Sequence, residues 1–360
     1  RKKGGASGKR AAAESDDESA GTANADFWWL SPELVQALET NQKSGKQSLL
    51  FLNRRGYANF LQCTDCGHVF RCSFCSVTLT LHLKRRDLRC HHCDYHMPFV
   101  ERCPACGASA LSGMGLGTEQ IESALRRIFP GARIARMDRD TTRRRGSQLT
   151  LLQQWERGEI DILIGTQMIT KGHDVSGVTL VGAVLADLSL NFPDFRAAER
   201  TFQLLSQVAG RSGRGESPGR VIIQTYAADH YAIRHLIDHD YKAFFDAEIE
   251  FRRALHYPPY SRLINLRFEG PKADKVEQRA QRVARALRAL TAIPRSHSKL
   301  DVLGPAPAPI YKLRNRYRWQ ILLKGDRVSA LQQLALAARA TAPDSRSVRL
   351  QIDVDPYNML

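Results

Sequence analysis

The sequence predicts an α/β protein in three parts: a parallel sheet flanked by helices, an insert built on eight cysteines, and a carboxyl-terminal α+β domain. Three observations support this prediction. Short apolar runs alternate with helical patterns between residues 47 and 225, four C-x-x-C pairs interrupt this alternation, and a strand–helix–strand–helix–strand order follows residue 241. Short apolar runs that alternate with helices indicate parallel strands with helices on both faces.

Composition and charge set the class of protein. The chain has 360 residues, of which 43% are hydrophobic and 25% charged, which suits about two to three globular domains. The formal net charge of +16 favours a polyanionic partner, most often nucleic acid, over the alternatives of a basic proteome or a ribosome-associated protein. No run of 18 or more apolar residues occurs, so no membrane partner is expected.

The first residues are basic and no apolar run follows them, so we expect no signal peptide and a cytoplasmic protein. Because the sequence does not start with Met, we expect a fragment. Residues 1–26 consist mainly of Gly, Ala, Ser and charged residues, which predicts a flexible linker. The expected divisions after it are residues 27–62 with 107–240 for the parallel-sheet domain, 63–106 for the insert and 241–360 for the last domain.

Local patterns define the elements. Ser31 and Pro32 have the types preferred for an N-cap and a first helical position, and residues 48–52 are apolar as in a strand buried on both faces. We expect the proline-rich residues 305–309 to form a stiff turn. Further helices are expected at residues 119–129, 149–157, 195–208, 272–291 and 327–340, and further strands at 132–137, 161–165, 178–186, 220–225, 263–268, 319–324 and 348–354.

Every cysteine belongs to a C-x-x-C pair. Two residues between the cysteines of a pair let both thiolates point at one ion from a tight turn, which we call a knuckle. Two knuckles complete a tetrahedral site of four thiolates, so eight cysteines make two zinc sites with none left over. Such sites have no open position and are structural. Four disulfides, or one redox pair, are alternatives that a chain without a signal peptide disfavours. The cysteines are Cys63, Cys66, Cys72, Cys75, Cys90, Cys93, Cys103 and Cys106.

The pairing of the knuckles is less determined. Gly67 and Gly107 each follow the second cysteine of an outer pair, where a knuckle turns back, and 14 residues separate the two inner pairs. This favours a nested arrangement, although an arrangement of alternate pairs stays open. Four histidines are then surplus and are expected on the surface or facing DNA: His68, His91, His92 and His96. The favoured sites are Cys63/Cys66/Cys103/Cys106 and Cys72/Cys75/Cys90/Cys93.

Two segments carry residues suited to phosphates. Residues 165–174 leave the end of an expected parallel strand, which is where ligands bind such sheets. Residues 207–214 read Q-x-x-G-R-x-G-R and place two guanidinium groups three residues apart, so that both can face one triphosphate. An arginine there stabilises charge on a transferred phosphoryl group, an effect on the order of 10³–10⁵ in rate. Taken singly, either arginine is more often a surface charge.

These two segments resemble motifs V and VI in the second RecA-like lobe of superfamily 2 helicases. Together with the eight cysteines, five further segments narrow the resemblance to the carboxyl-terminal half of the PriA family, the primosomal protein N-prime helicases of bacterial replication restart. The resemblance runs from about Leu30 to Pro356. The five segments are residues 52–57, 117–120, 186–197, 304–310 and 316–320.

The resemblance implies roles for single residues. Arg211 and Arg214 would reach the nucleotide phosphates from across the cleft between two lobes, with Arg214 as the preferred finger. Ser212 stands where the family usually has Ala, and residues 175–177 depart from its usual Phe-Pro-Asn, which affects the shape of that loop. The resemblance further assigns the nucleotide side to Gly172, Asp174 and Gln207, and the DNA backbone to Thr166 and Gln167.

The chain lacks a G-x-x-x-x-G-K-[ST] loop and a D-E-x-H box, which the family keeps on its first lobe. We therefore expect half of an ATPase site, which cannot hydrolyse ATP alone and works with ATP and Mg²⁺ only in the full-length protein. That protein would unwind DNA 3′ to 5′ at abandoned forks and start primosome assembly. A zinc-containing DNA-binding or scaffold protein of the primosome without a working motor is the alternative.

The carboxyl-terminal domain is expected to meet DNA and proteins. Residues 312–319 interleave cationic and aromatic side chains, a pattern typical of contact with single-stranded or branched nucleic acid. The alternative is that Tyr317 and Trp319 alternate into the core as strand residues. By resemblance, this domain contributes to binding branched DNA and the acidic tail of the single-strand binding protein, next to other primosome proteins. We expect Arg316, Arg318 and Arg327 to take part.

Overall fold

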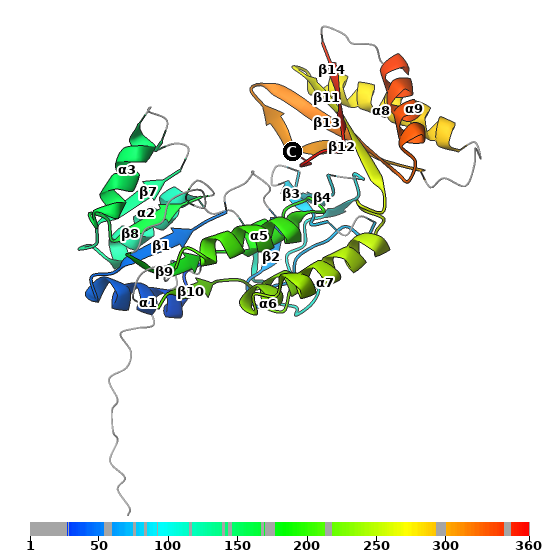
Figure 1. The fold of residues 1–360 in the computed structure, drawn as a ribbon. Helices are drawn as coiled ribbons and strands as arrows, with labels where there is room; N and C mark the ends of the chain where they lie inside the picture. The colour runs from blue at the N-terminus through cyan, green and yellow to red at the C-terminus, as the bar shows by residue number, and fades with distance from the viewer. Residues whose placement is uncertain are drawn as a thin grey trace, which may run out of the picture.

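The computed structural model shows several sheets, two of them packed against helices (Figure 1). The predicted linker lies outside the described residues. No helix in the described part of the chain is long and apolar enough to cross a bilayer. The structure describes residues 27, 29–53, 60–74, 77–82, 85–91, 93–114, 117–138, 141–142, 146–166, 169, 177–212, 218–292, 300–341 and 347–359.

A five-stranded sheet with the order β10-β9-β1-β8-β7 forms the first part, and each neighbouring pair is parallel, as predicted. The central strand β1 is buried along its whole length, which agrees with its uninterrupted apolar sequence. The strands are β1 (Gln47–Phe51), β7 (Ile134–Met137), β8 (Ile162–Gly165), β9 (Val178–Ala183) and β10 (Arg220–Ile223).

Helices cover both faces of this sheet, because alternate residues of β1 enter two different cores. Leu49 and Phe51 pack with side chains of α3 and α5, whereas Leu50 packs with side chains of α1 and α2. The predicted cap of α1 is present, since Ser31 Oγ accepts a hydrogen bond from the backbone N–H of Leu34. The helices are α1 (Pro32–Lys43), α2 (Thr118–Ile128), α3 (Ser147–Glu156), α4 (Asp187–Leu190), α5 (Ala197–Ala209), α6 (Tyr231–Ile237) and α7 (Tyr241–Ala254).

The cysteine-rich segment between β1 and α2 forms two small antiparallel sheets, β2–β6 and β3-β4-β5. Its own core includes Leu61, Leu79 and Leu88, all of them at most 1% exposed. We call this segment the zinc module, residues 60–114. Its strands are β2 (Phe60–Cys63), β3 (Thr80–His82), β4 (Asp87–Arg89), β5 (His96–Pro98) and β6 (Leu111–Met114).

The last part is an antiparallel sheet with the order β12-β13-β11-β14. Two helices cover one face, where Phe268, Val283 and Leu331 share a core. Asn265 and Gln320, also buried, pair across neighbouring strands and point to the other face. The elements are β11 (Arg262–Gly270), α8 (Ala273–Thr291), β12 (Leu300–Leu313), β13 (Arg316–Gly325), α9 (Val328–Thr341) and β14 (Arg349–Val354).

The prediction of a stiff turn at residues 305–309 was wrong, because these residues belong to β12. Proline has no N–H to give to a sheet, which normally removes it from strands. Here β12 is an edge strand, and its register against β13 shifts on both sides of the paired residues Ala306 and Pro307. An edge strand needs donors on one side only, so it accepts prolines that a central strand could not.

Candidate functional site

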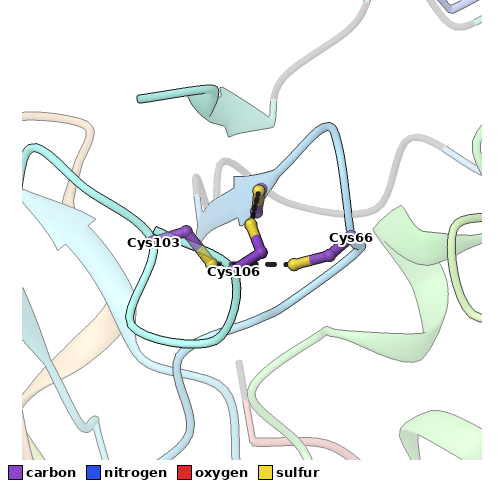
Figure 2. Close-up of side chains that lie close together, drawn as sticks. Cys66, Cys103 and Cys106 are labelled. Carbon is purple, nitrogen blue, oxygen red and sulfur yellow. Dashed lines mark hydrogen bonds between the residues drawn. The ribbon is translucent and has the colours of Figure 1, made fainter. Parts of the chain in front are cut away.

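The first cysteine cluster joins the two ends of the zinc module. The Sγ atoms of Cys63, Cys66, Cys103 and Cys106 all lie within 4.8 Å of one another (Figure 2). The Sγ atoms are 3.7 Å apart between Cys63 and Cys106 and 3.6 Å apart between Cys66 and Cys103. A zinc tetrahedron with Zn–S bonds of about 2.3 Å has S–S edges of about 3.8 Å. The cluster therefore fits one zinc ion.

The backbone of this cluster has the turn that the glycines predicted. The N–H of Gly67 donates to the Cys63 carbonyl at 2.9 Å, and the N–H of Gly107 donates to the Cys103 carbonyl at 2.8 Å. Both glycines have positive φ angles, +74° and +75°. Desolvation opposes ionisation of Cys103, but hydrogen bonds from the backbone of Cys106 and Ala105 lower its pKa to about 7. A thiol so placed is suited to bind metal as the thiolate.

The second cluster contains Cys72, Cys90 and Cys93, also within 4.8 Å of one another, with Cys72 and Cys93 Sγ atoms 3.5 Å apart. Cys75, the fourth predicted ligand, lies outside the described residues. Asp94 takes the place of the knuckle glycine: its φ is +67° and its N–H donates to the Cys90 carbonyl at 3.1 Å. Aspartate tolerates this left-handed region better than most residues do.

The nested pairing is confirmed for the described cysteines, and the arrangement of alternate pairs was wrong. The S–S separations of 3.5–3.7 Å are far longer than a disulfide bond of about 2.05 Å, so the disulfide alternative does not fit either. Two cysteine clusters could thus each hold zinc. A zinc ion with four thiolate ligands would crosslink the loops and leave no position for substrate.

The first cluster rests on the parallel-sheet part. A Cβ atom on Gly67 would meet the carbonyl oxygen of Tyr226 at 2.6 Å, so the knuckle lies directly on the segment after β10. Asp187, which is 1% exposed, accepts hydrogen bonds from Tyr226 N–H at 3.1 Å and Gln62 Nε2 at 3.4 Å. Burial raises the pKa of this carboxyl group, although the hydrogen bonds oppose the rise. Asp187, the first residue of α4, therefore links β2 to the segment after β10.

The second cluster contacts the carboxyl-terminal sheet through His91, which sits between Cys90 and Cys93. Its ring is 1% exposed, and its Nδ1 lies 2.6 Å from the carbonyl oxygen of Pro307. Gln320 Nε2 donates to the His91 carbonyl at 2.8 Å. The prediction that His91 is a surface or DNA-facing group was wrong, because it fills the contact between two parts of the fold.

The other surplus histidines differ. His96 is exposed and His68 is half-buried, while His92 lies outside the described residues. The exposed position of His96 agrees with its prediction as a surface group.

The residues expected at the nucleotide and at the DNA backbone lie at two edges of the parallel sheet, with Thr166 after the end of β8 and Arg211 beside the starts of β9 and β10. Thr166 directly follows β8, and its N–H donates to the carbonyl of Met137 at the end of β7. Arg211 follows α5 and lines a cavity of about 30 Å³ together with Ile169, which belongs to the loop after β8. Gln207 is exposed on the last turn of α5. Four expected residues lie outside the described residues: Gln167, Gly172, Asp174 and Arg214.

Ser212, which replaces the Ala that is usual in the family, is compatible with this arrangement. Its Oγ donates toward the carbonyl oxygens of Thr179 at 3.2 Å and Arg220 at 3.3 Å. These two residues begin neighbouring strands, so the hydroxyl fastens the end of α5 to the sheet next to Arg211.

Arg316 and Arg318 lie on β13 and share one carboxylate. Glu269 is 2.7 Å from Arg316 Nε and 3.3 Å from Arg318 Nε. Trp319 is buried in the core under α8 and Tyr317 packs against it, so the alternation of these two residues into the core is confirmed. Arg327 is exposed just before α9. Of the expected pattern, only the cationic side chains face outward.

Comparison with known proteins gives two family matches. The Primosomal protein N C-terminal domain matches residues 253–357, and the PriA DNA helicase Cys-rich region domain matches residues 72–98. The Replication restart protein PriA of Bacillus subtilis is 41% identical over 334 residues, which are 92% of this chain and 41% of that protein. The protein of the same name from Synechocystis sp. is 43% identical over 92% of this chain and 39% of its own length.

The chain thus spans about two fifths of the length of these relatives. Among solved structures, the Pyrococcus furiosus Hef helicase domain matches 54% of this chain and 24% of its own chain, with 17% identity and a TM-score of 0.25. So low a score supports no conclusion about function.

Proposed function

From the membership of this chain in the PriA family, whose carboxyl-terminal region it represents, we propose that it supplies half of an ATP-dependent DNA helicase of the bacterial cytoplasm. The helicase acts at stalled or branched replication forks and starts primosome assembly. One observation carries the proposal: the similarity to replication restart proteins runs through 92% of the chain, across both sheets and the zinc module.

In this proposal residues 27–62 and 107–240 form the second motor lobe, residues 63–106 its zinc-binding insert, and residues 241–360 a domain for DNA and partner proteins. The alternation of Leu49 and Leu50 between two cores supports a lobe covered by helices on both faces. The proposed partners are branched and single-stranded DNA, the single-strand binding protein and other primosome proteins.

The chain contributes its arginines to the ATP site. Arg211, just after α5, and Arg214 act on a nucleotide held by another lobe, where a guanidinium group stabilises charge on the γ-phosphoryl group. Gln207, Gly172 and Asp174 lie on the nucleotide side. The common cavity of Arg211 and Ile169 supports this assignment, because it brings the loop after β8 and the end of α5 together.

The remaining proposed contacts are with DNA. Thr166 and Gln167 contact the backbone, in keeping with the place of Thr166 at the carboxyl edge of the sheet. Arg316 and Arg318 contact branched DNA or the acidic tail of the single-strand binding protein. Because Glu269 is one carboxylate against two guanidinium groups, this part of β13 keeps a net positive charge.

ATP hydrolysis tests the proposal. The purified chain alone should show no DNA-stimulated hydrolysis, whereas the longer protein that contains it should hydrolyse ATP. In that longer protein, Arg214→Ala should lower kcat on the order of 10³-fold or more. Arg220→Ala, at an exposed arginine that begins β10, is the matched control and should leave kcat unchanged.

Two results would contradict the proposal. Hydrolysis by the chain alone would show that it does not hold only half of the site. A longer protein that also failed to hydrolyse ATP would favour the alternative of a DNA-binding scaffold without a working motor.

A further inference from the structure

An open cleft of about 530 Å³ lies where the second cysteine cluster meets the carboxyl-terminal sheet. In Figure 1 the strands β3 and β4 lie beneath this sheet, and the contact of His91 with Pro307 joins the two parts. The volume lies within the range of about 300–1,000 Å³ that small-ligand sites have, so the cleft admits single groups and not a duplex. The zinc module supplies one wall, and α8, β12 and β13 supply the other.

The zinc-module wall presents an exposed aromatic ring. Phe74 is 75% exposed and lies inside a cysteine knuckle. A small or polar residue at this exposed position would not lower the stability of the fold. Phe74 lines the cleft and contacts Tyr95 edge to face, with ring centroids 5.6 Å apart and planes at 70°. This contact holds the ring in place and leaves one face of Phe74 free for a further partner.

The opposite wall combines aromatic and cationic side chains. Trp319 and Arg288 line the cleft, and Arg288 is held by donating a hydrogen bond to the carbonyl of Gly304. Tyr317 lies two residues before Trp319 on the same face of β13, and Lys312 Nζ lies 5.0 Å from its ring centroid. Trp319 is 3% exposed and Tyr317 packs against the same core, so this wall offers mainly its cationic group to an occupant.

Arg288 is the lining cation that the cleft offers to an anionic occupant. Asp94, a lining carboxylate, is paired at 2.8 Å with Arg89, which also pairs with Asp87 at 3.3 Å. The chain as a whole has a formal net charge of +16, which attracts polyanions. Aromatic faces interleaved with cations are the pattern by which proteins stack bases of single strands and bind their phosphates.

We infer that this cleft holds one unstacked nucleotide of single-stranded DNA, with its base against Phe74 and its phosphate toward Arg288. The inference deepens the proposed function, on which it rests for the choice of DNA. It gives the zinc module a direct contact with the nucleic acid in addition to its role in holding the loops. Stacking on a ring is tolerant of sequence, so the site takes any base.

Fluorescence of 2-aminopurine tests the inference, because stacking on an aromatic ring quenches this base. A short oligothymidylate with one 2-aminopurine is titrated with the chain at low salt, and anisotropy of an end label reports affinity in parallel. Phe74→Ala should abolish the quenching that saturates with binding and weaken affinity by roughly 5- to 100-fold. Phe74→Trp should retain both. Phe245→Ala, at an exposed ring on α7, is the control and should change neither.

Because Phe74 lies between two predicted ligands, the zinc content of each variant is measured with a chelating dye. Phe74→Leu keeps the apolar volume and removes the stacking face, so a variant that retains zinc and loses quenching supports the inference. Unchanged quenching in zinc-loaded Phe74→Ala would overturn it while the chain's DNA binding, and the proposed function, stand. Failure of the chain to bind the oligonucleotide at all would instead contradict both. Binding of an acidic peptide that is lost in Phe74→Ala, together with no quenching of 2-aminopurine by the chain, would assign the cleft to a protein partner. This result would also overturn the inference.

Discussion

The two cysteine clusters are built alike and are placed differently. In each, a knuckle turns back through a left-handed residue, Gly67 or Gly107 in the first cluster and Asp94 in the second. The first cluster rests on the segment after β10 at Tyr226, whereas the second reaches the carboxyl-terminal sheet through His91. The comparison shows that one small module joins two larger parts, with a separate metal site next to each joint.

Removing one site at a time should have the largest effect and should separate the joints. Structural zinc sites contribute apparent binding free energies of about 10–16 kcal/mol, so a lost ligand should disorder its own loops. Cys90→Ser should raise hydrogen exchange in β12 and β13, near the contacts of His91 with Pro307 and Gln320. Hydrogen exchange in β10 should be the same as in the unmodified protein.

Cys103→Ser is the matched variant, because Cys103 is as buried as Cys90. It should raise exchange around Tyr226 and leave the carboxyl-terminal sheet protected. If both variants raised exchange in the same peptides, the module would be one cooperative unit and the two sites would not serve separate joints.

Acid should loosen the joint at the parallel-sheet part through His230. Burial, together with the positive charge of Arg71 in the zinc module, lowers the pKa of His230 to about 4. Neutral His230 accepts a hydrogen bond from the N–H of Ala232 at the start of α6. Because the unfolded chain binds this proton at about pH 6.5, the stabilisation is complete above that pH and is lost toward pH 4.

The free energy of unfolding should fall by at most about 3 kcal/mol between about pH 7 and about pH 4.5 through this group. Urea unfolding at the two pH values measures the difference. His230→Asn keeps a cap acceptor that does not titrate, and should unfold with a smaller difference between the two pH values. An equal loss in both proteins would mean that His230 does not cause the acid sensitivity.

The smallest effect is expected from adding one methyl group to each glycine of the first cluster. Gly67 and Gly107 have nearly the same φ, so Gly→Ala at either should cost about 1 kcal/mol through the left-handed backbone. A Cβ on Gly107 meets no atom within 4 Å, but on Gly67 it meets Tyr226 O at 2.6 Å. Gly67→Ala should therefore lower the free energy of unfolding by about 1–2 kcal/mol more.

Denaturant unfolding of the zinc-loaded variants measures this difference. Equal costs at Gly67 and Gly107 would show that the module does not rest on Tyr226 in solution.

Local patterns in the sequence predicted the parallel sheet well. The apolar run of β1 indicated burial on both faces, and the types of Ser31 and Pro32 marked the start of α1. The strand order was not readable in this way, because β1 pairs with β8 and β9 more than 100 residues away. The strand β12 was missed for another reason. Proline lacks a backbone N–H and therefore argues against a strand, and only the tertiary structure shows that β12 is an edge strand, which does not need that donor.

The metal clusters were predictable because spacing alone decides them. Gly67 and Gly107 even indicated which pairs combine. The surroundings were not predictable: His91 was assigned to the surface since it was not needed as a ligand, and its buried contact with Pro307 joins residues 216 positions apart. Likewise, nothing near Arg316 in the sequence shows that Glu269, on another strand, neutralises part of its charge.

The prolines of β12 have a consequence for solubility. An exposed sheet edge can pair with the edge of another molecule and start aggregation, and natural proteins block such edges. Pro305, Pro307 and Pro309 stand at every second position, so one side of β12 lacks donors at three successive sites. The carbonyl of Pro307 is already taken by His91. This part of the edge therefore cannot template a further strand, even at high concentrations of the chain.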